Sequence, residues 1–111
     1  MKANVEIDAG VCGFRTTACA TSQDNQNVTF DLDTNCDKIQ RLGQVLRDKG
    51  PVDAYQEISP GGPAVVMTTV QKILTGCCTG CAVPIGLFKA MQVAAGLALP
   101  KDINIKLVKE D

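Results

Sequence analysis

The feature that most constrains this chain is a strict alternation of apolar and polar residues in its first third. Apolar residues occupy every second position over Asn4–Ala9, and the same period recurs over Phe14–Ser22 and Val28–Leu32. A period of two indicates a strand with one buried face. Because a turn-forming run, Asp24–Asn27, separates the last two segments, the sequence predicts a three-stranded antiparallel meander.

Three later segments carry apolar residues at helical spacing instead. They run from Thr34 to Lys49, from Pro63 to Gly76, and from Pro84 to about Gly96. Proline at the start of a helix and glycine at its end are favoured positions. Thr34 is expected to cap the first helix through its hydroxyl, which would leave Cys36 in the first helical turn.

A final alternation at Ile103–Leu107 predicts a C-terminal strand in the same sheet. The fold class is therefore α+β, with the N-terminal meander and this strand in one sheet and three helices on one face. With 111 residues, the chain is expected to form a single domain over residues 1–111. The segment Asp53–Ile58 fits either a short strand or an irregular stretch.

Composition excludes several function classes. The chain has no histidine and no tryptophan, and its net charge is −1. Catalytic pairs that need histidine are excluded, and without a basic cluster we expect no nucleic-acid partner. The most apolar stretch, Val93–Leu99, is too short to cross a bilayer. The first ten residues lack the apolar run of a secretory signal, so we expect a cytoplasmic protein with no membrane partner.

Cysteine is the unusual residue type. The six are Cys12, Cys19, Cys36, Cys77, Cys78 and Cys81. In a cytoplasmic protein such a set indicates metal or redox chemistry more often than disulfides. Cys78 and Cys81 form a C-x-x-C pair before the helix that starts at Pro84, and the positive end of a helix dipole favours thiolate.

Two further cysteines also lie at places that suit an exposed thiolate. Cys12 lies in a turn bracketed by Gly10 and Gly13, and Cys36 lies at the start of the first helix. We therefore predict a metal site with Cys12, Cys36, Cys78 and Cys81 as ligands, and Cys77 as the alternative to Cys78. Cys19 lies in mid-strand among small residues and is expected to pack in the structure.

The residues leave three functions open. The first is a protein that binds an iron–sulfur cluster, or zinc, for electron transfer, sensing or structure; both centres are held by cysteine thiolates. The second is a dithiol redox protein that uses Cys78 and Cys81. The third is an interaction module with structural cysteines. A redox or cluster-transfer protein is the expected partner, a homodimer is one option, and catalysis is left open.

Four motifs resemble those of a group of small uncharacterised domains from anaerobic archaea and bacteria. They are Val11–Phe14 (VCGF), a cysteine at the first helix start, Cys81–Pro84 (CAVP) and Gly96–Asp102 (GLALPKD). The resemblance covers nearly the whole chain and implies Cys12, Cys36 and Cys81 as site residues, with a fourth from Cys77 or Cys78. Unlike those domains, this chain has paired cysteines and no histidine upstream of the CAVP motif. The resemblance implies no established activity.

Overall fold

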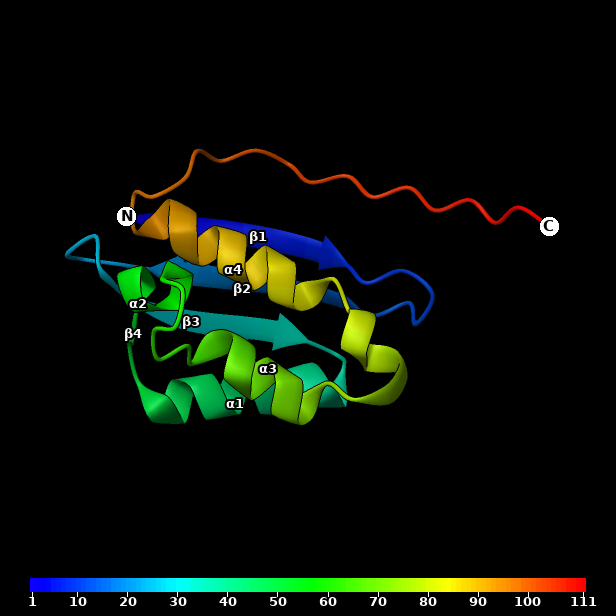
Figure 1. The fold of residues 1–111 in the computed structure, drawn as a ribbon, viewed down its shortest axis with the longest axis horizontal. Helices are drawn as coiled ribbons and strands as arrows, with labels where there is room; N and C mark the ends of the chain where they lie inside the picture. The colour runs from blue at the N-terminus through cyan, green and yellow to red at the C-terminus, as the bar shows by residue number, and fades with distance from the viewer.

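The three alternating segments form adjacent strands in the computed structural model, which describes residues 1–111. They are β1 (Lys2–Asp8), β2 (Arg15–Thr21) and β3 (Asn27–Thr34). A two-residue strand, β4 (Val52–Asp53), completes an antiparallel sheet of order β1-β2-β3-β4. Figure 1 shows the sheet behind the helices.

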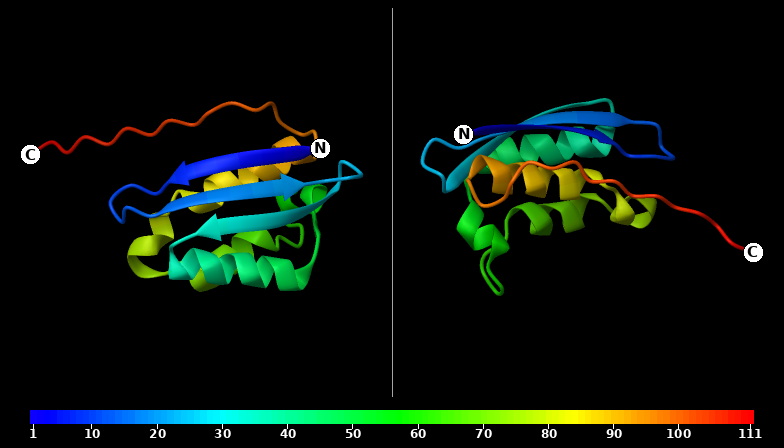
Figure 2. Two further views of the ribbon diagram at one scale, coloured as in Figure 1. Left: turned by 180° about the vertical axis from the view of Figure 1, so that it is seen from behind. Right: turned by 90° about the horizontal axis from the view of Figure 1, so that it is seen from above.

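Alternation decides which side chains enter the core. The buried rows of the sheet include Ala3, Ile7, Ala18, Ala20, Val28 and Phe30. Across the strands, Val5 pairs with Ala18 and Ala18 with Leu32, so apolar side chains line up on one face. The intervening polar residues point to the opposite face, which no helix covers (Figure 2).

The helices all lie on the apolar face of the sheet (Figure 2). They are α1 (Asp37–Lys49), α2 (Ala54–Ile58), α3 (Val66–Ile73) and α4 (Val83–Ala94), with a 3₁₀ turn, η1 (Gly76–Gly80), before α4. Helix α4 packs on β1 and β2, α1 packs on β3, and α3 contacts both helices. The predicted α+β class and N-terminal meander are confirmed.

Helix α4 approaches β1 closely because residue 86 is glycine. A Cβ atom there would overlap the buried Ile7 side chain and touch Val5. The close approach buries Leu87 and Met91 completely. The stretch Gly76–Ala94 is long and apolar enough to span a membrane by length and composition alone. However, α4 is a core helix of this fold, and core helices pass the same test.

The fourth strand is not the predicted one. Ile103–Leu107 forms no strand and is exposed to solvent, whereas Val52–Asp53 pairs with Asn27 and Val28. Alternation gives a segment the right side chains for a sheet, but a strand also needs an edge to pair with. The end of α1 brings Val52–Asp53 to the β3 edge of the sheet, whereas Ile103–Leu107 makes no backbone hydrogen bond to the open β1 edge.

Two helix starts also differ from the prediction. Helix α1 begins at Asp37 rather than Thr34, because Thr34 remains paired with Thr16 in the sheet. Helix α3 begins at Val66 rather than at Pro63. Its N-cap residue, Val65, has no side-chain hydrogen bond to the helix start.

A carboxylate from another element caps α3. Glu57 in α2 is buried, and its two oxygens accept hydrogen bonds from the backbone N–H groups of Val65 and Val66, each at 2.6 Å. The first N–H groups of a helix lack partners within the helix, and a negative charge there is favoured by the helix dipole. Glu57 therefore fixes the start of α3 against α2.

Candidate functional site

Five of the six cysteines lie at one end of the molecule. The β1–β2 turn with Cys12, the β3–α1 junction with Cys36, and η1 with Cys77, Cys78 and Cys81 after it all come to this end (Figure 1). The three segments are distant in the sequence. Four of these five cysteines are called the thiol cluster below: Cys12, Cys36, Cys78 and Cys81.

Cys36 is the N-cap residue of α1 and is half-buried against the core. Its backbone N–H donates to the Thr34 hydroxyl oxygen at 3.2 Å, and the Thr34 hydroxyl also accepts from the Thr16 hydroxyl at 2.9 Å. Because Thr16 and Thr34 are both buried, this pair ties the position of Cys36 to the sheet. Thr34 thus orients Cys36 instead of capping the helix itself.

Cys78 and Cys81 are held by a tight backbone turn. The Cys81 N–H donates to the Cys78 carbonyl oxygen at 3.1 Å, and the Cys78 N–H donates to the Thr75 carbonyl oxygen at 3.2 Å. Both side chains are half-buried and pack against the core. The Lys38 ammonium donates to the Cys78 sulfur at 3.5 Å, so a positive charge from α1 lies beside this thiol.

The Cys81 thiol is the electrostatic centre of the thiol cluster. Burial raises its pKa above the ordinary value of 9.0, and the nearby thiols of Cys12, Cys36 and Cys78 raise the pKa further. The backbone N–H of Val83 opposes this effect by hydrogen bonding to the sulfur. The three other thiols act on Cys81 because the folded chain brings them close to it.

Cys12 is the exposed member of the cluster. Its turn is closed by a hydrogen bond from the Gly13 N–H to the Gly10 carbonyl oxygen at 2.9 Å, and both glycines have positive φ angles. Such angles are strained for other residues. The turn is therefore a defined hairpin loop, with its cysteine facing solvent.

The six thiols are all free, and no three cysteine or carboxylate side chains stand at the mutual distances of a metal site. Cys77 is exposed and is not among the thiols that act on Cys81. The cluster is thus a set of neighbouring reduced thiols, with three of its members seated against the core and one on a solvent-facing turn.

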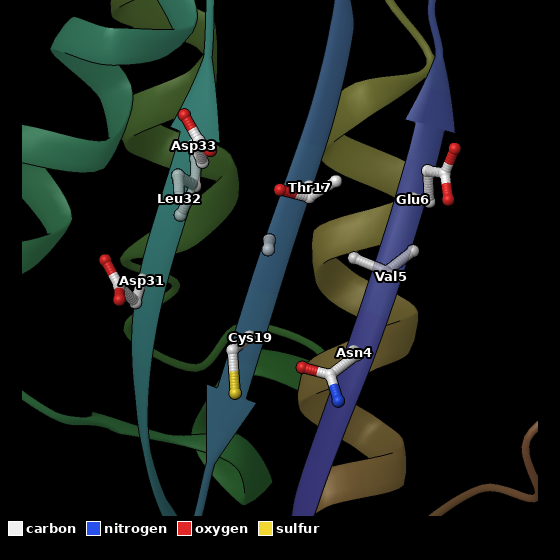
Figure 3. Close-up of a pocket in the computed structure, with 9 residues that line it drawn as sticks. Asn4, Val5, Glu6, Thr17, Cys19, Asp31, Leu32 and Asp33 are labelled. Carbon is white, nitrogen blue, oxygen red and sulfur yellow. The ribbon is translucent and has the colours of Figure 1, made fainter.

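Cys19 was predicted to pack in the structure, but it does not lie in the core. It lies on the uncovered face of the sheet, half-buried, with its sulfur 3.7 Å from the Thr21 hydroxyl. Figure 3 shows Cys19 between Asn4 and Asp31 in a shallow depression of this face. The register of β2 places every odd-numbered residue of the strand on that face, which separates Cys19 from the thiol cluster.

Sequence reasoning missed Lys38 and the Val83 N–H. One signal for Lys38 was present: a basic residue in the first turn of a helix is disfavoured by the helix dipole, so its presence there points to a negative group nearby. No sequence signal could have identified the Val83 N–H, because a backbone group at any residue type can hydrogen-bond to the Cys81 sulfur.

Fold and cysteines together define a small α+β protein with a thiol-rich end. The chain belongs to the family of unknown function DUF6951, which matches residues 3–107. No curated protein and no solved structure matches the chain. The expected membership of an uncharacterised family is therefore confirmed.

The raised pKa of Cys81 predicts a distinct pH dependence of thiol alkylation in the metal-free protein. Only the thiolate reacts, so the pH at half-maximal alkylation of Cys81, read by mass spectrometry, should lie above 9.0. Replacing a neighbour, Cys36→Ser, removes one repulsive charge and should lower that pH. Cys19→Ser, on the other face of the sheet, should leave it unchanged. An unchanged midpoint in Cys36→Ser would show that the two thiols do not interact.

Proposed function

We propose that the protein binds an iron–sulfur cluster through the thiolates of Cys12, Cys36, Cys78 and Cys81. The observation that supports this most directly is that three segments far apart in the sequence bring these four cysteines to one end of the molecule (Figure 1). Neighbouring thiols repel one another once ionised, and a bound cation relieves that repulsion. Cysteine thiolates are the ligands that such clusters use.

The four cysteines differ in how firmly the fold holds them. Cys36, Cys78 and Cys81 are half-buried and pack against the core, so the fold fixes three of the four proposed ligands on one side of the site. Cys12 is exposed on its hairpin turn. No three of these side chains stand at the mutual distances of a metal site, so binding a metal requires the thiols to come closer together.

We further propose a cytoplasmic location, where thiols stay reduced, and a redox or cluster-transfer protein as partner. The Lys38 ammonium at 3.5 Å from the Cys78 sulfur supports an anionic centre at this place. A cluster with four thiolates carries net negative charge, and a fixed cation beside it stabilises that charge. The reduction potential of the proposed cluster would distinguish a role in electron transfer or sensing from a structural role.

The test is anaerobic purification and reconstitution of the full chain, followed by iron, zinc and sulfide analysis and visible absorption. Iron and sulfide in similar amounts, with a broad absorption that air bleaches, are expected. Cys36→Ser and Cys81→Ser should each lower bound iron several-fold. Two matched controls, Cys19→Ser and Cys77→Ser, should keep it. Zinc without sulfide would assign a structural zinc site to the same ligands, and no bound metal would overturn the proposal.

A dithiol redox function is the second candidate, favoured by the asymmetry of the C-x-x-C pair. Cys78 has the Lys38 ammonium beside it, whereas burial raises the pKa of Cys81 and keeps it protonated. In this reaction the Cys78 thiolate attacks a partner disulfide, and Cys81 then displaces the partner as a dithiol, leaving a Cys78–Cys81 disulfide. Here Cys12→Ser and Cys36→Ser should retain the activity, because neither thiol takes part.

A further inference from the structure

The C-terminal tail, residues 98–111, is an extended segment without a partner. It forms no backbone hydrogen bond and no helix or strand. Several large apolar side chains on it are exposed: Leu99, Ile103, Ile105, Leu107 and Val108. Leu107 is 92% exposed, which is a heavy exposure for a segment whose alternation is that of a half-buried strand.

Strand β1 offers the complementary feature, an open sheet edge. It is the first strand in the order β1-β2-β3-β4 and pairs only with β2. Val5, in the middle of its inward-facing row, stays half-exposed although Ala3 and Ile7 on either side are buried. An unpaired edge presents a row of free N–H and C=O groups that can bind another strand.

The tail and β1 match residue by residue when they are aligned in parallel with Asp102 beside Lys2. The inward rows then pair as Ile103 with Ala3, Ile105 with Val5, and Leu107 with Ile7. The outward rows place Asp102 beside Lys2 and Lys106 beside Glu6, two pairs of opposite charge. Opposite charges at neighbouring positions of a sheet stabilise the pairing.

The connector directs the tail away from its own sheet. Gly96 lies beside Met1, so the tail starts at the beginning of β1 and then runs in the same general direction, apart from the sheet (Figure 1, Figure 2). Pro100 fixes its own φ angle and favours an extended Leu99, and the tail beyond it makes no backbone hydrogen bond to the adjacent β1 edge. A segment that leaves its own fold unpaired is free to pair with the same edge of a second copy.

We propose that residues 102–108 pair with β1 of a second copy of this chain, and that the two copies exchange their tails reciprocally. Each copy contributes one tail and one open edge, which gives a closed two-fold interface. Stable complexes typically bury about 1,600 Å² in total, and a reciprocal exchange adds the area of two tails and two edges to one interface. The sheet of each copy gains a fifth strand, and Val5 becomes buried.

The test measures the mass of the full chain in solution by light scattering across a range of concentrations. The expected mass is that of two 11.7 kDa chains. Ile105→Asp, which places a charge in the inward row, should weaken the dimer by about 100-fold, since an unpaired charge is costly to bury. The matched control, Asn104→Asp, adds the same charge on the outward row and should leave the dimer intact.

Amide hydrogen exchange provides the second measurement. In the dimer, the alternate amides of 103–107 that point towards β1 should exchange slowly, and they should exchange rapidly in Ile105→Asp. A single-chain mass at all concentrations would overturn the proposal. Slow exchange at the tail of a single-chain protein would show that the tail pairs with its own β1. A dimer unaffected by Ile105→Asp would place the interface elsewhere, and that result would overturn the proposal as well.

Discussion

Replacing Glu57 by alanine is expected to lower the free energy of unfolding by about 3 kcal/mol. The Glu57 carboxylate accepts two short hydrogen bonds from the N–H groups of Val65 and Val66. Its removal leaves the buried N–H of Val66 and the half-buried N–H of Val65 without a partner, and each unsatisfied buried group costs roughly 1–3 kcal/mol. Urea unfolding followed by circular dichroism measures the loss.

Two controls separate the cap from other effects at this position. Glu57→Gln keeps the side-chain length and one accepting oxygen, so it should lose less stability than Glu57→Ala. Gln56→Ala changes the exposed neighbour in the same helix and should stay within about 0.5 kcal/mol of the parent protein. A Glu57→Ala variant as stable as Gln56→Ala would mean that water satisfies the two N–H groups.

The elements that the sequence predicted well are those specified by local chemistry. The first three strands follow from alternation and from turn residues such as Asp24, whose side chain accepts from the N–H groups of Gln26 and Asn27. Helix α4 begins close to the predicted Pro84, because proline suits the first helical turn. In each case the residues that determine the structure lie within a few positions of it.

The elements that were missed depend on distant partners. Strand β4 has two residues, too few for any period to show, and it exists because it pairs with Asn27 and Val28. Glu57 caps α3 from another helix, so no local sequence pattern predicts the cap. Ile103–Leu107 carries a strand pattern but pairs with no strand, although the β1 edge of the sheet is open. Alternation shows that a segment is suited to a sheet, but whether the segment pairs with another strand depends on the rest of the fold.

The candidate site shows the same division. Cys36 and the Cys78–Cys81 pair could be singled out because they lie next to helix starts, which is a local property. The contact between Lys38 and Cys78 joins two segments 40 positions apart and needs the fold. Cys19 was expected to pack because its neighbours are small, but it lies half-buried on the uncovered face of the sheet, the face opposite Ala18 and Ala20 to which the alternation of the strand assigns it.

Metal binding is expected to produce the largest change in stability. Zn²⁺ is a convenient probe, because four thiolates bind it tightly without sulfide. With free zinc held about 1,000-fold above its dissociation constant, the free energy of unfolding should rise by about 4 kcal/mol. Thermal unfolding with buffered zinc measures the gain, and a chelator should reverse it. Cys36→Ser should lose most of the gain, whereas Cys19→Ser should keep it.

The gain should also depend on pH, with a sign fixed by Cys81. A metal binds the thiolate, so it must displace the proton that the raised pKa of Cys81 holds. Zinc therefore competes less well with protons at lower pH, and the stabilisation at a fixed free zinc concentration should increase as the pH rises from 6 to 8. Cys77→Ser should follow the parent curve, because that thiol does not act on Cys81. A gain independent of pH would mean that zinc binds through carboxylates, which are already ionised in this range, and would remove the thiol cluster from the site.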